Sequence, residues 1–380
     1  MPQRLRVLLV STLLVLLAAL CVTPPVPVVA TPLPDAIDDR AFWQMIDDFS
    51  EPNGYFRSDN LVSNETAFQH VIPELQKRAA PAGVYLGVGP DQNFTYIVAL
   101  QPRIAFIVDV RRQNMLLHLM YKALIELSAD RAEFLSRLFA RPRPDALGPH
   151  STAEDLFSAY SLVLPDQRLL RATLDLVVDR LVVAHGFHPK DGDIASLEYV
   201  YRAFVDGGPN LRYAFQSGGA GFTMAAFPTF ADLILESDTL GAHHSYLASE
   251  ENFAALRALE LANLIVPVVG DFGGPRALRA VGGYLRAHGA SVTAFYTSNV
   301  EQYLFQNGGW RRFFANVAAL PLDGGSLFVR AYFAGGGFRG PLGGGLRSTT
   351  LLDSMPDAVA AFSDGHIRSY RDVIERSWAP

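Results

Sequence analysis

The sequence has one cysteine among its 380 residues, Cys21, which excludes an internal disulfide and any zinc site built from cysteines. Basic residues are also few: 32 Lys and Arg against 38 Asp and Glu give a net charge of −6. That balance lacks the basic footprint with which general nucleic-acid binders neutralise phosphates. Hydrophobic residues make up 49% of the chain, which argues against disorder. We therefore expect a globular protein that stands on its core and binds no nucleic acid.

Several catalytic motifs are absent as well. The chain contains no G-x-S-x-G elbow, no phosphate-binding P-loop and no H-E-x-x-H pair, so hydrolase, P-loop nucleotidase and zincin activities have no direct support. His185 and His188, together with Asp191 and Asp193, are residue types that bind metals. They lie in a glycine- and proline-containing loop without the spacing of a metal site, so we expect no metal.

The N-terminus has the layout of a secretory signal. Arg4 and Arg6 precede an apolar stretch at 7–22, and the small-residue site 28–30 follows a proline-rich segment. Retention as a membrane anchor is the alternative, since about sixteen apolar residues fall slightly short of a full span. In both cases this segment contacts the membrane and the body is expected outside, as a periplasmic, extracellular or outward-facing anchored protein. A cytoplasmic location follows only if the start of the chain is assigned too early.

The body of the chain alternates between strand-like and helix-like patterns. Residues 84–88 and 104–108 are short apolar runs bounded by glycine, proline or charge, as in strands buried on both faces of a parallel sheet. Further strands are expected at 263–269, 291–296 and 326–333, with helices between them. This rhythm predicts an α/β fold with a doubly wound, mostly parallel sheet. The predicted organisation is a signal peptide or anchor at 1–30, a linker and first helix at 31–48, and an α/β domain at 49–380 with a large helical insertion at about 140–255.

Two local patterns carry more specific expectations. Residues 275–288 have helical periodicity and begin with Pro275, a residue that the first helical position favours. Within the helical insertion, residues 211–215 have the pattern of one strand.

The segment EPNGYFRSDNLVSNE, residues 51–65, is dense in short polar residues with glycine and proline, and we expect a loop. It is either a solvated connection with a helix cap at Ser63 or Asn64, or a lid over the glycine turn that follows it. As a lid it would offer side chains for substrate binding. The candidates are Tyr55, Arg57, Asn60, Asn64 and Glu65.

Polar and glycine residues follow each predicted strand, at the edge where open α/β sheets bind ligands. Gly87 and Gly89 allow a sharp turn and a close approach to a ligand. Asp109 follows Gly89 by about twenty residues, the spacing at which an acid accepts from ribose hydroxyls. These features favour a nucleoside-type ligand over a sheet that merely uses glycine to turn. Asn299 and Glu301, after a later strand, are candidates for acceptor binding or acid/base work.

The run VYLGVGPDQNFTY, followed by IAFIVDVRRQN, resembles the cofactor half of the S-adenosylmethionine-dependent methyltransferase fold. More closely it resembles a little-characterised bacterial family of methyltransferase-like proteins that share the GVGPDQNF and VDVRRQN segments. The resemblance covers about residues 45–140 and 260–335. It implies S-adenosylmethionine as the cofactor and a small-molecule or peptide acceptor. The implied cofactor-binding residues are Gly87, Gly89, Pro90, Asp91, Asn93, Asp109, Arg111 and Asp271: Gly87, Gly89 and Asn93 for the methionine part, Asp109 for the ribose, and Asp271 near the adenine or the reacting methyl.

The pattern departs from that family and from dinucleotide enzymes at identifiable positions. Tyr85 stands where methyltransferases usually place an acid, and Gln92 replaces the third glycine of a dinucleotide fingerprint, which disfavours NAD and FAD. Arg111 and Arg112 would suit an added phosphate, or would cap the next helix or contact solvent. No catalytic residue can be named, because methyl transfer needs little from a protein beyond alignment.

Three functions therefore stay open: a methyltransferase, an exported non-catalytic protein that binds a ligand with the same fold, and another enzyme with a nucleotide cofactor. S-adenosylmethionine is a cytosolic metabolite, so the signal-like N-terminus favours the second. The polar residues gathered at the strand ends favour the first or the third.

Overall fold

The computed structural model describes residues 31–79, 83–214, 227–333 and 348–380. Residues 32–380 form one compact unit. The predicted signal or anchor at 1–30, with Cys21, lies outside the described residues. Within the described ranges no helix is long and apolar enough to cross a membrane.

The centre of the fold is one six-stranded sheet with the order β3-β2-β1-β4-β5-β6. The first five strands run parallel, and β6 pairs antiparallel with β5. The predicted α/β class with a mostly parallel sheet is thereby confirmed. The strands are β1 (Val84–Gly87), β2 (Ile104–Asp109), β3 (Ile265–Val269), β4 (Val292–Ser298), β5 (Leu322–Phe333) and β6 (Ser348–Ser354).

The three strands β1, β2 and β3 are buried at every residue, which explains why they appear in the sequence as continuous apolar runs. In the parallel register, Gly87 of β1 lies beside Ile107 of β2, and Asp109 at the end of β2 lies beside Val269 of β3. The residues that follow these strands therefore meet at one edge of the sheet.

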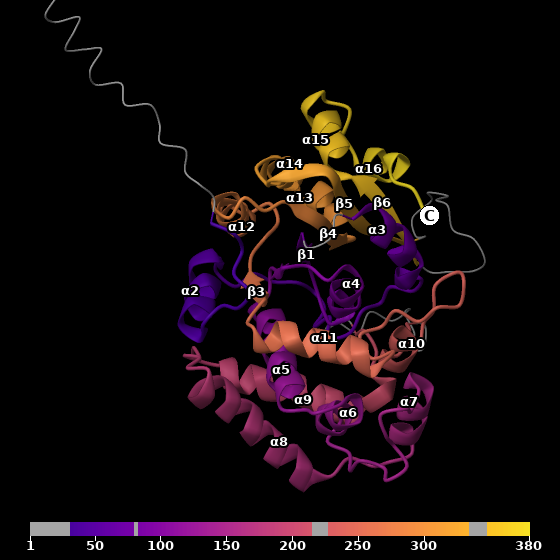
Figure 1. The fold of residues 1–380 in the computed structure, drawn as a ribbon. Helices are drawn as coiled ribbons and strands as arrows, with labels where there is room; N and C mark the ends of the chain where they lie inside the picture. The colour runs from indigo at the N-terminus through magenta and orange to yellow at the C-terminus, as the bar shows by residue number, and fades with distance from the viewer. Residues whose placement is uncertain (1–30, 80–82, 215–226, 334–347) are drawn as a thin grey trace, which may run out of the picture. The chain divides into compact units, whose positions relative to one another are not determined.

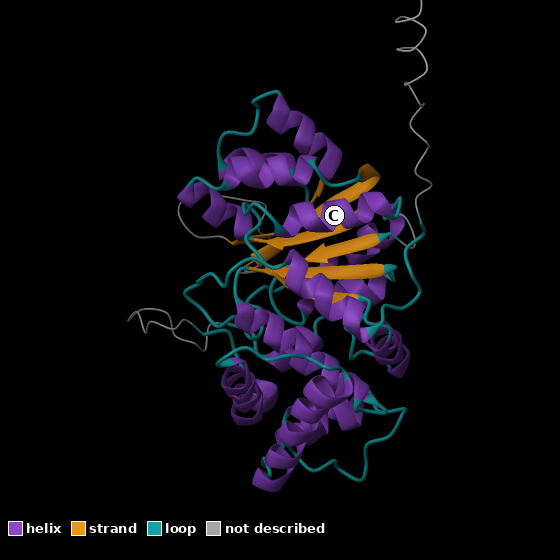
Figure 2. Ribbon diagram, turned by 90° about the vertical axis from the view of Figure 1, so that its left-hand side faces the viewer, coloured by secondary structure: helices purple, strands orange, loops and turns teal. Residues whose placement is uncertain are grey.

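Helices cover both faces of the sheet. The helices α4 (Gln92–Leu100) and α5 (Arg112–Glu126) follow β1 and β2, whereas α12 (Ala277–Ala287) and α14 (Trp310–Ala318) follow the connections from β3 and β4. Right-handed crossovers place these two pairs on opposite faces, because the chain moves outward from β1 in one direction and from β4 in the other. In Figure 2 the strands lie between helices above and below. Helix α11 (Glu250–Leu261) packs on α4 and α5.

Other helices complete the two layers and the ends of the unit. Helix α2 (Asp39–Phe49) packs against β3 and α12. The chain enters β1 through the 3-10 helix η1 (Phe68–Val71) and α3 (Ile72–Arg78). The remaining C-terminal helices are α13 (Val300–Asn307), directly after β4, α15 (Met355–Ser363) and α16 (Tyr370–Arg376).

In the described residues between α5 and α11 the named elements are all helical, and Figure 1 places most of them beyond α5, away from the sheet. Helix α9 packs along α5 and joins this segment to the sheet layer. The strand expected near residue 211 is reduced, in the described residues, to one isolated bridge between Arg212 and Thr229. The elements are α6 (Arg131–Leu138), α7 (Ala153–Ser161), α8 (Gln167–Asp179), the π-helix η2 (Arg180–Ala184), α9 (Asp193–Gly207), η3 (Gly208–Asn210) and α10 (Phe230–Ile234).

The prediction that a helix begins at Pro275 is wrong, because α12 begins two residues later. The helix begins at Ala277, with Arg276 at the N-cap, and Pro275 precedes both. A distant carboxylate caps the first turn, since Glu51 accepts hydrogen bonds from the amides of Arg276 at 2.7 Å and Ala277 at 2.9 Å. Such a cap cannot be read from the local sequence.

The expected cap at Ser63 or Asn64 is also wrong. The next helix, η1, begins only at Phe68, after Ala67 in the left-handed conformation. The Ser63 hydroxyl accepts instead from the amide of Glu65 at 3.1 Å, which closes a tight turn at the end of the 51–65 loop.

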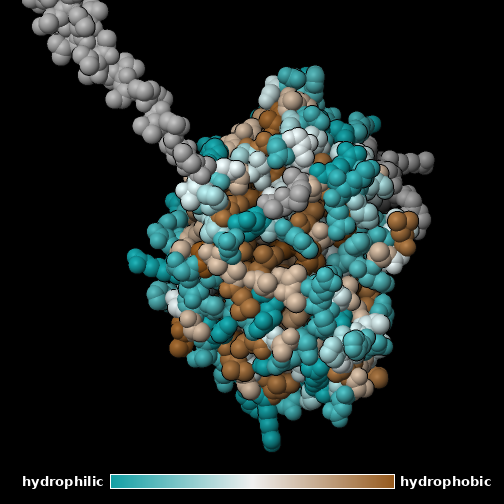
Figure 3. All heavy atoms as spheres, viewed as in Figure 1, coloured by the Kyte–Doolittle hydropathy of each residue, from teal (hydrophilic) through white to brown (hydrophobic). Residues whose placement is uncertain are grey.

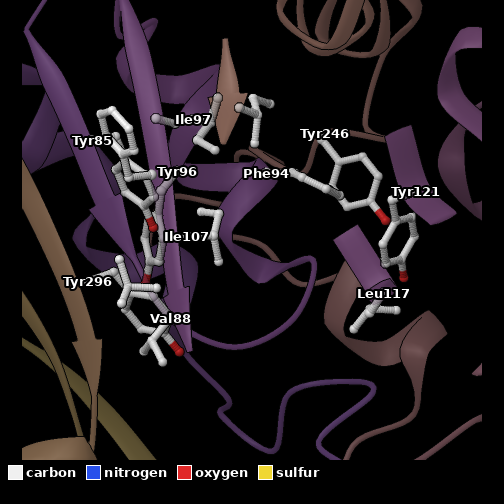
Figure 4. Packing of buried hydrophobic residues seen from close by; sticks show 14 of the residues in the cluster. Tyr85, Val88, Phe94, Tyr96, Ile97, Ile107, Leu117, Tyr121, Tyr246 and Tyr296 are labelled. Carbon is white, nitrogen blue, oxygen red and sulfur yellow. The ribbon is translucent and has the colours of Figure 1, made fainter. Parts of the chain in front are cut away.

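Aromatic rings fill the space beside α4. In Figure 4, Tyr85, Tyr96 and Tyr296 form a row along the sheet, and Phe94 points the other way, toward Tyr246. The ring centroids are 5.3 Å apart for Tyr96 and Tyr296 and 5.4 Å apart for Phe94 and Tyr246. On the outer face seen in Figure 3, apolar side chains gather near the middle and polar ones predominate around them.

Candidate functional site

A pocket of about 240 Å³ lies at the carboxyl ends of β1, β2, β3 and β4. This is the edge at which parallel α/β sheets bind ligands, and the strand order reverses between β1 and β4. The pocket walls come from the 51–65 loop, from the residues after each of the four strands, from α13, and from Tyr213 of the helical segment.

The 51–65 loop forms one wall of the pocket. It is fixed to the ends of the strands, because the amide of Gly54 donates to the carbonyl of Val110 at 2.8 Å and Asn53 Oδ1 accepts from the amide of Arg112 at 2.7 Å. The segment is therefore part of the pocket wall, and its role as a lid that binds substrate stays a prediction. Six of its residues line the pocket: Tyr55, Phe56, Asn60, Ser63, Asn64 and Glu65.

The glycine turn after β1 contributes Gly89 and Pro90 to the pocket, but not Gly87. Gly89 has φ +78°, and a β-carbon there would lie 3.2 Å from Asn60 Nδ2 of the loop. Gly87 has a different role, because a β-carbon at that position would lie 1.9 Å from Asn93 Oδ1. Asn93 shapes the turn from beneath by donating to the carbonyls of Val88 at 2.9 Å and Pro90 at 2.6 Å.

Asp91 is buried at the start of α4 and does not line the pocket. Its Oδ2 accepts from the hydroxyl of Tyr246 at 2.9 Å, and burial raises the pKa of the carboxyl to about 7. The N-terminus of α4 therefore already holds an acidic group.

Asp109, at the end of β2, is bound by Arg111 in a two-pronged ion pair. Asp109 Oδ1 accepts from the amide of Arg111 at 2.9 Å and from its Nε at 3.0 Å, and Oδ2 accepts from its Nη2 at 2.9 Å. Both side chains are less than 10% exposed. Burial alone would disfavour the charged guanidinium, but Asp109 beside it raises the pKa of Arg111.

Arg111 also holds the loop. Its Nη1 donates to the carbonyl oxygens of Ser58, at 2.9 Å, and Asp59. The next residue, Arg112, pairs with Asp193 of α9 through Nε at 2.7 Å and Nη2 at 2.6 Å. Both arginines after β2 are thus committed to carboxylates of this chain.

Asp271 and Phe272 line the pocket directly after β3. Asp271 Oδ1 accepts from the amide of Gly273 at 2.8 Å, and its own amide donates to Glu51 Oε2 at 3.2 Å. Its second carboxylate oxygen has no such bond among the described residues, so it can accept from a ligand.

The end of β4 supplies Ser298 and Asn299, and α13 supplies Tyr303 and Asn307. Ser298 has φ +52°, an uncommon backbone conformation for a residue other than glycine. Such strained residues cluster at functional sites, which singles out the end of β4. Arg57 does not line the pocket; its Nη2 donates to the hydroxyl of Tyr303 at 3.3 Å.

Glu301, expected to take part in acceptor binding or acid/base work, lies outside the pocket lining. It is buried and pairs with Arg330 of β5, which also pairs with Asp353 of β6 at 2.8 Å. This ion-paired cluster joins β5, β6 and α13.

In the described pocket lining, Glu65 and Asp271 are carboxylates without an ion pair. Of the two, Glu65 is deeply buried, with 1% of its surface exposed. Its Oε1 accepts from the hydroxyls of Tyr296, at 2.8 Å, and Ser298. Its Oε2 accepts from Gln92 Nε2 at 3.1 Å. Burial raises the pKa of Glu65, and these three hydrogen bonds lower it by less.

Sequence reasoning did not single out Tyr213 or Tyr303 as site residues. Ser298 lies in the polar stretch 297–299 that follows the expected strand at 291–296, and the structure places it in the pocket lining. The two tyrosines carry no usable signal, because α13 was not predicted and Tyr213 reaches the pocket from the segment after α9.

The histidines considered as metal ligands are placed elsewhere. His185 bonds to Asp39 at 2.8 Å and to Glu126 at 2.7 Å. Glu126 also pairs with Lys122 at 2.7 Å, so these residues form an ionic cluster, buried at Lys122 and Glu126, that joins α2, α5 and the end of η2. Asp193 is taken by Arg112.

Fold and site together define an α/β protein with a pocket at the switch point of a mostly parallel sheet. The model of a family described as a domain of unknown function (DUF7790) matches residues 60–147 and 229–364, more than half of the chain, and the protein belongs to that family. The matched segments hold all six strands and most of the pocket, and the interval between them holds α7, α8 and α9. No curated protein matches the sequence.

Proposed function

We propose that this protein is a methyltransferase that uses S-adenosylmethionine. The observation that carries the proposal is the charge of the pocket at the switch point. Glu65, Asp109 and Asp271 line it with three carboxylates, and Arg111, the single cation in the described lining, is already paired with Asp109. Such a site favours a positively charged ligand, and the sulfonium of this cofactor carries a positive charge.

The residues of the pocket fit the cofactor. Gly89 brings its backbone to the pocket surface in a conformation that other residues adopt rarely. A carboxylate has about four acceptor positions, and Asp109 uses three of them on Arg111, so one stays available for a ribose hydroxyl. The free oxygen of Asp271 can accept from an adenine amine.

Aromatic side chains supply the remaining surface. Tyr55 and Phe56 of the loop, Phe272 after β3 and Tyr303 of α13 all line the pocket. Aromatic faces stack on an adenine ring and attract a cation, which suits both ends of the proposed ligand.

The same geometry disfavours ligands that carry phosphates. A phosphate at the glycine turn would meet the N-terminus of α4, where Asp91 is buried. Arg111 and Arg112, the residues that would suit an added phosphate, pair with Asp109 and Asp193. NAD and ATP would therefore find no uncommitted cation in the described lining.

When bound, the cofactor supplies a methyl group activated by its positively charged sulfur. The chain itself would align the acceptor at the end of β4 and exclude water with the 51–65 loop. We propose further that the sheet is of the methyltransferase type and that the helices between α5 and α11 are an insertion into it. The order of its first five strands, that of doubly wound nucleotide-binding sheets, supports this.

Calorimetric titration of the protein with S-adenosylmethionine, S-adenosylhomocysteine, ATP and NAD tests the proposal. We expect binding of the first two ligands and none of the others. The variant Asp271→Asn keeps the acceptor oxygen that bonds to Gly273 and removes one negative charge, so it should weaken S-adenosylmethionine more than neutral S-adenosylhomocysteine. Binding of ATP or NAD in place of these ligands would overturn the proposal.

A second candidate is a non-catalytic protein that binds a ligand in the same pocket. The ion pair between Asp109 and Arg111 favours this candidate. Most acceptor positions of the carboxylate that is expected to bind the ribose already accept hydrogen bonds from Arg111. Binding of S-adenosylhomocysteine together with the absence of methyl transfer to any acceptor in a cell extract would support this candidate.

A further inference from the structure

Glu65 occupies the part of the pocket that faces β4. Its carboxylate joins three elements, since its hydrogen-bond donors are Tyr296 and Ser298 at the end of β4 and Gln92 at the start of α4. The adenosine-facing residues Asp109 and Asp271 lie after β2 and β3, on the other side of β1. Glu65 is therefore placed at the half of the pocket where an acceptor would meet the cofactor.

The donors around Glu65 are all neutral. Two other buried carboxylates have a cationic partner, Asp109 in Arg111 and Asp193 in Arg112. Asp91 is buried with a tyrosine as its partner, but it does not line the pocket. A buried carboxylate without a cation is unfavourable, and burial raises the pKa of Glu65 accordingly. Among the described residues no cation pairs with Glu65, and Glu65 lines the pocket.

We propose that Glu65 is the counter-ion and then the proton acceptor of a protonated amine, so that the methyl acceptor is an amine. The inference rests on the proposed function and names the acceptor class for the same site. The amine would approach Oε2, which accepts one hydrogen bond, from Gln92, whereas Oε1 already accepts two.

The chemical step assigned to Glu65 is a proton transfer. One proton moves from the ammonium nitrogen to Glu65 Oε2, which leaves a neutral amine and a neutral carboxyl group. The nitrogen lone pair is then free to form the bond to the methyl carbon, while the electron pair of the breaking carbon–sulfur bond stays on sulfur. A carboxyl with a raised pKa is better suited to hold this proton than an exposed one.

Among the titratable groups packed around Glu65, the carboxylate of Glu65 is the one that accepts the proton. Tyr85 of β1, Tyr96 of α4 and Tyr296 of β4 have pKa values raised well above 10, mainly by burial, so they stay neutral. Glu236 and Tyr370 also interact electrostatically with Glu65. Glu236, after α10, has a pKa raised to about 7 mainly by burial and also by Glu65, and burial is the main cause that raises the pKa of Tyr370 of α16.

The variant Glu65→Gln removes the charge and keeps the shape. Its amide oxygen can accept from Tyr296 and Ser298, and its amide nitrogen can donate to Gln92 Oε1, which has no partner among the described residues. Asp91→Asn is the matched control, because Asp91 is also buried and bonded to a tyrosine but does not line the pocket.

Two cofactor analogues make the test independent of turnover. S-adenosylhomocysteine is neutral at the reacting position, whereas sinefungin carries a protonated amine in place of the methyl group. We expect the wild type and Asp91→Asn to bind sinefungin about tenfold more tightly than S-adenosylhomocysteine, as a charged hydrogen bond would give. In Glu65→Gln that preference should vanish with S-adenosylhomocysteine affinity unchanged. In the wild type the preference should also fall as the pH is lowered through the raised pKa of Glu65.

The outcomes separate the two proposals. If neither analogue binds the wild type, both the proposed function and the amine acceptor are overturned. If S-adenosylhomocysteine binds but sinefungin binds no more tightly, or if Glu65→Gln weakens both analogues equally, the amine acceptor is overturned and the proposed function stands.

Discussion

The ion pair between Asp109 and Arg111 gives the most demanding prediction for stability. The substitution Arg111→Met keeps much of the apolar stem and removes the guanidinium. Asp109 then keeps only the bond from the backbone amide of residue 111, at 2.9 Å, and loses those from Nε and Nη2. The carbonyl oxygens of Ser58 and Asp59 in the loop lose their donor at the same time.

The expected loss follows from the burial of the pair. Asp109 is 5% exposed, so the variant leaves a buried carboxylate without its cation, a change that costs about 3–5 kcal/mol in proteins. The double variant Asp109→Asn/Arg111→Met leaves neither charge buried. It should therefore be more stable than Arg111→Met alone, and the two substitutions should couple by about 1–3 kcal/mol.

Urea unfolding of the wild type, the two single variants and the double variant measures this coupling. Hydrogen exchange reports the local effect. The substitution Arg111→Met should accelerate the exchange of the amides of residues 51–65 more than that of the amides of β5. A loss below about 1 kcal/mol for Arg111→Met, or a double variant that loses the sum of the single losses, would refute the argument that this pair fixes the loop.

Three further predictions concern other parts of the molecule. Asp91 has a pKa of about 7 in the folded protein against 3.8 as its ordinary value, so between these pH values the folded state binds more protons and stability falls as the pH rises. Asp91→Asn should remove the part of that fall that Asp91 contributes, on the order of 4 kcal/mol, in urea unfolding at pH 4 and pH 8. Gly89→Ala forces φ +78° on alanine and should cost about 1–2 kcal/mol, measured by thermal unfolding, while weakening ligand binding. Arg330→Met should cost about 3–5 kcal/mol in urea unfolding, because it leaves Glu301 buried without its cation, and it should leave ligand affinity unchanged.

The central part of the fold could be predicted because it depends on local patterns. Strands β1 and β2 are apolar at nearly every position and are bounded by glycine, proline or charge, and helices follow both. The rule that ligands bind beyond the strand ends then placed Gly89, Asp109 and Asp271 correctly along the pocket.

The rest depends on contacts between residues far apart in the chain. The cap of α12 comes from Glu51, more than 200 residues earlier, and so the expected role of Pro275 failed. Glu301 is taken by Arg330, a partner 29 residues away that no local pattern indicates. Likewise, Arg111 donates to the carbonyl oxygens of Ser58 and Asp59, 53 and 52 residues earlier, a contact that no local pattern indicates.

The crystal structure of the protein with S-adenosylhomocysteine is the most direct test of the central claim. The account predicts density in the pocket, with the ribose against Asp109, the adenine between Asp271 and the aromatic rings, and the sulfur on the side of Glu65. A pocket that stays empty at saturating ligand, or a ligand bound elsewhere on the protein, would contradict it.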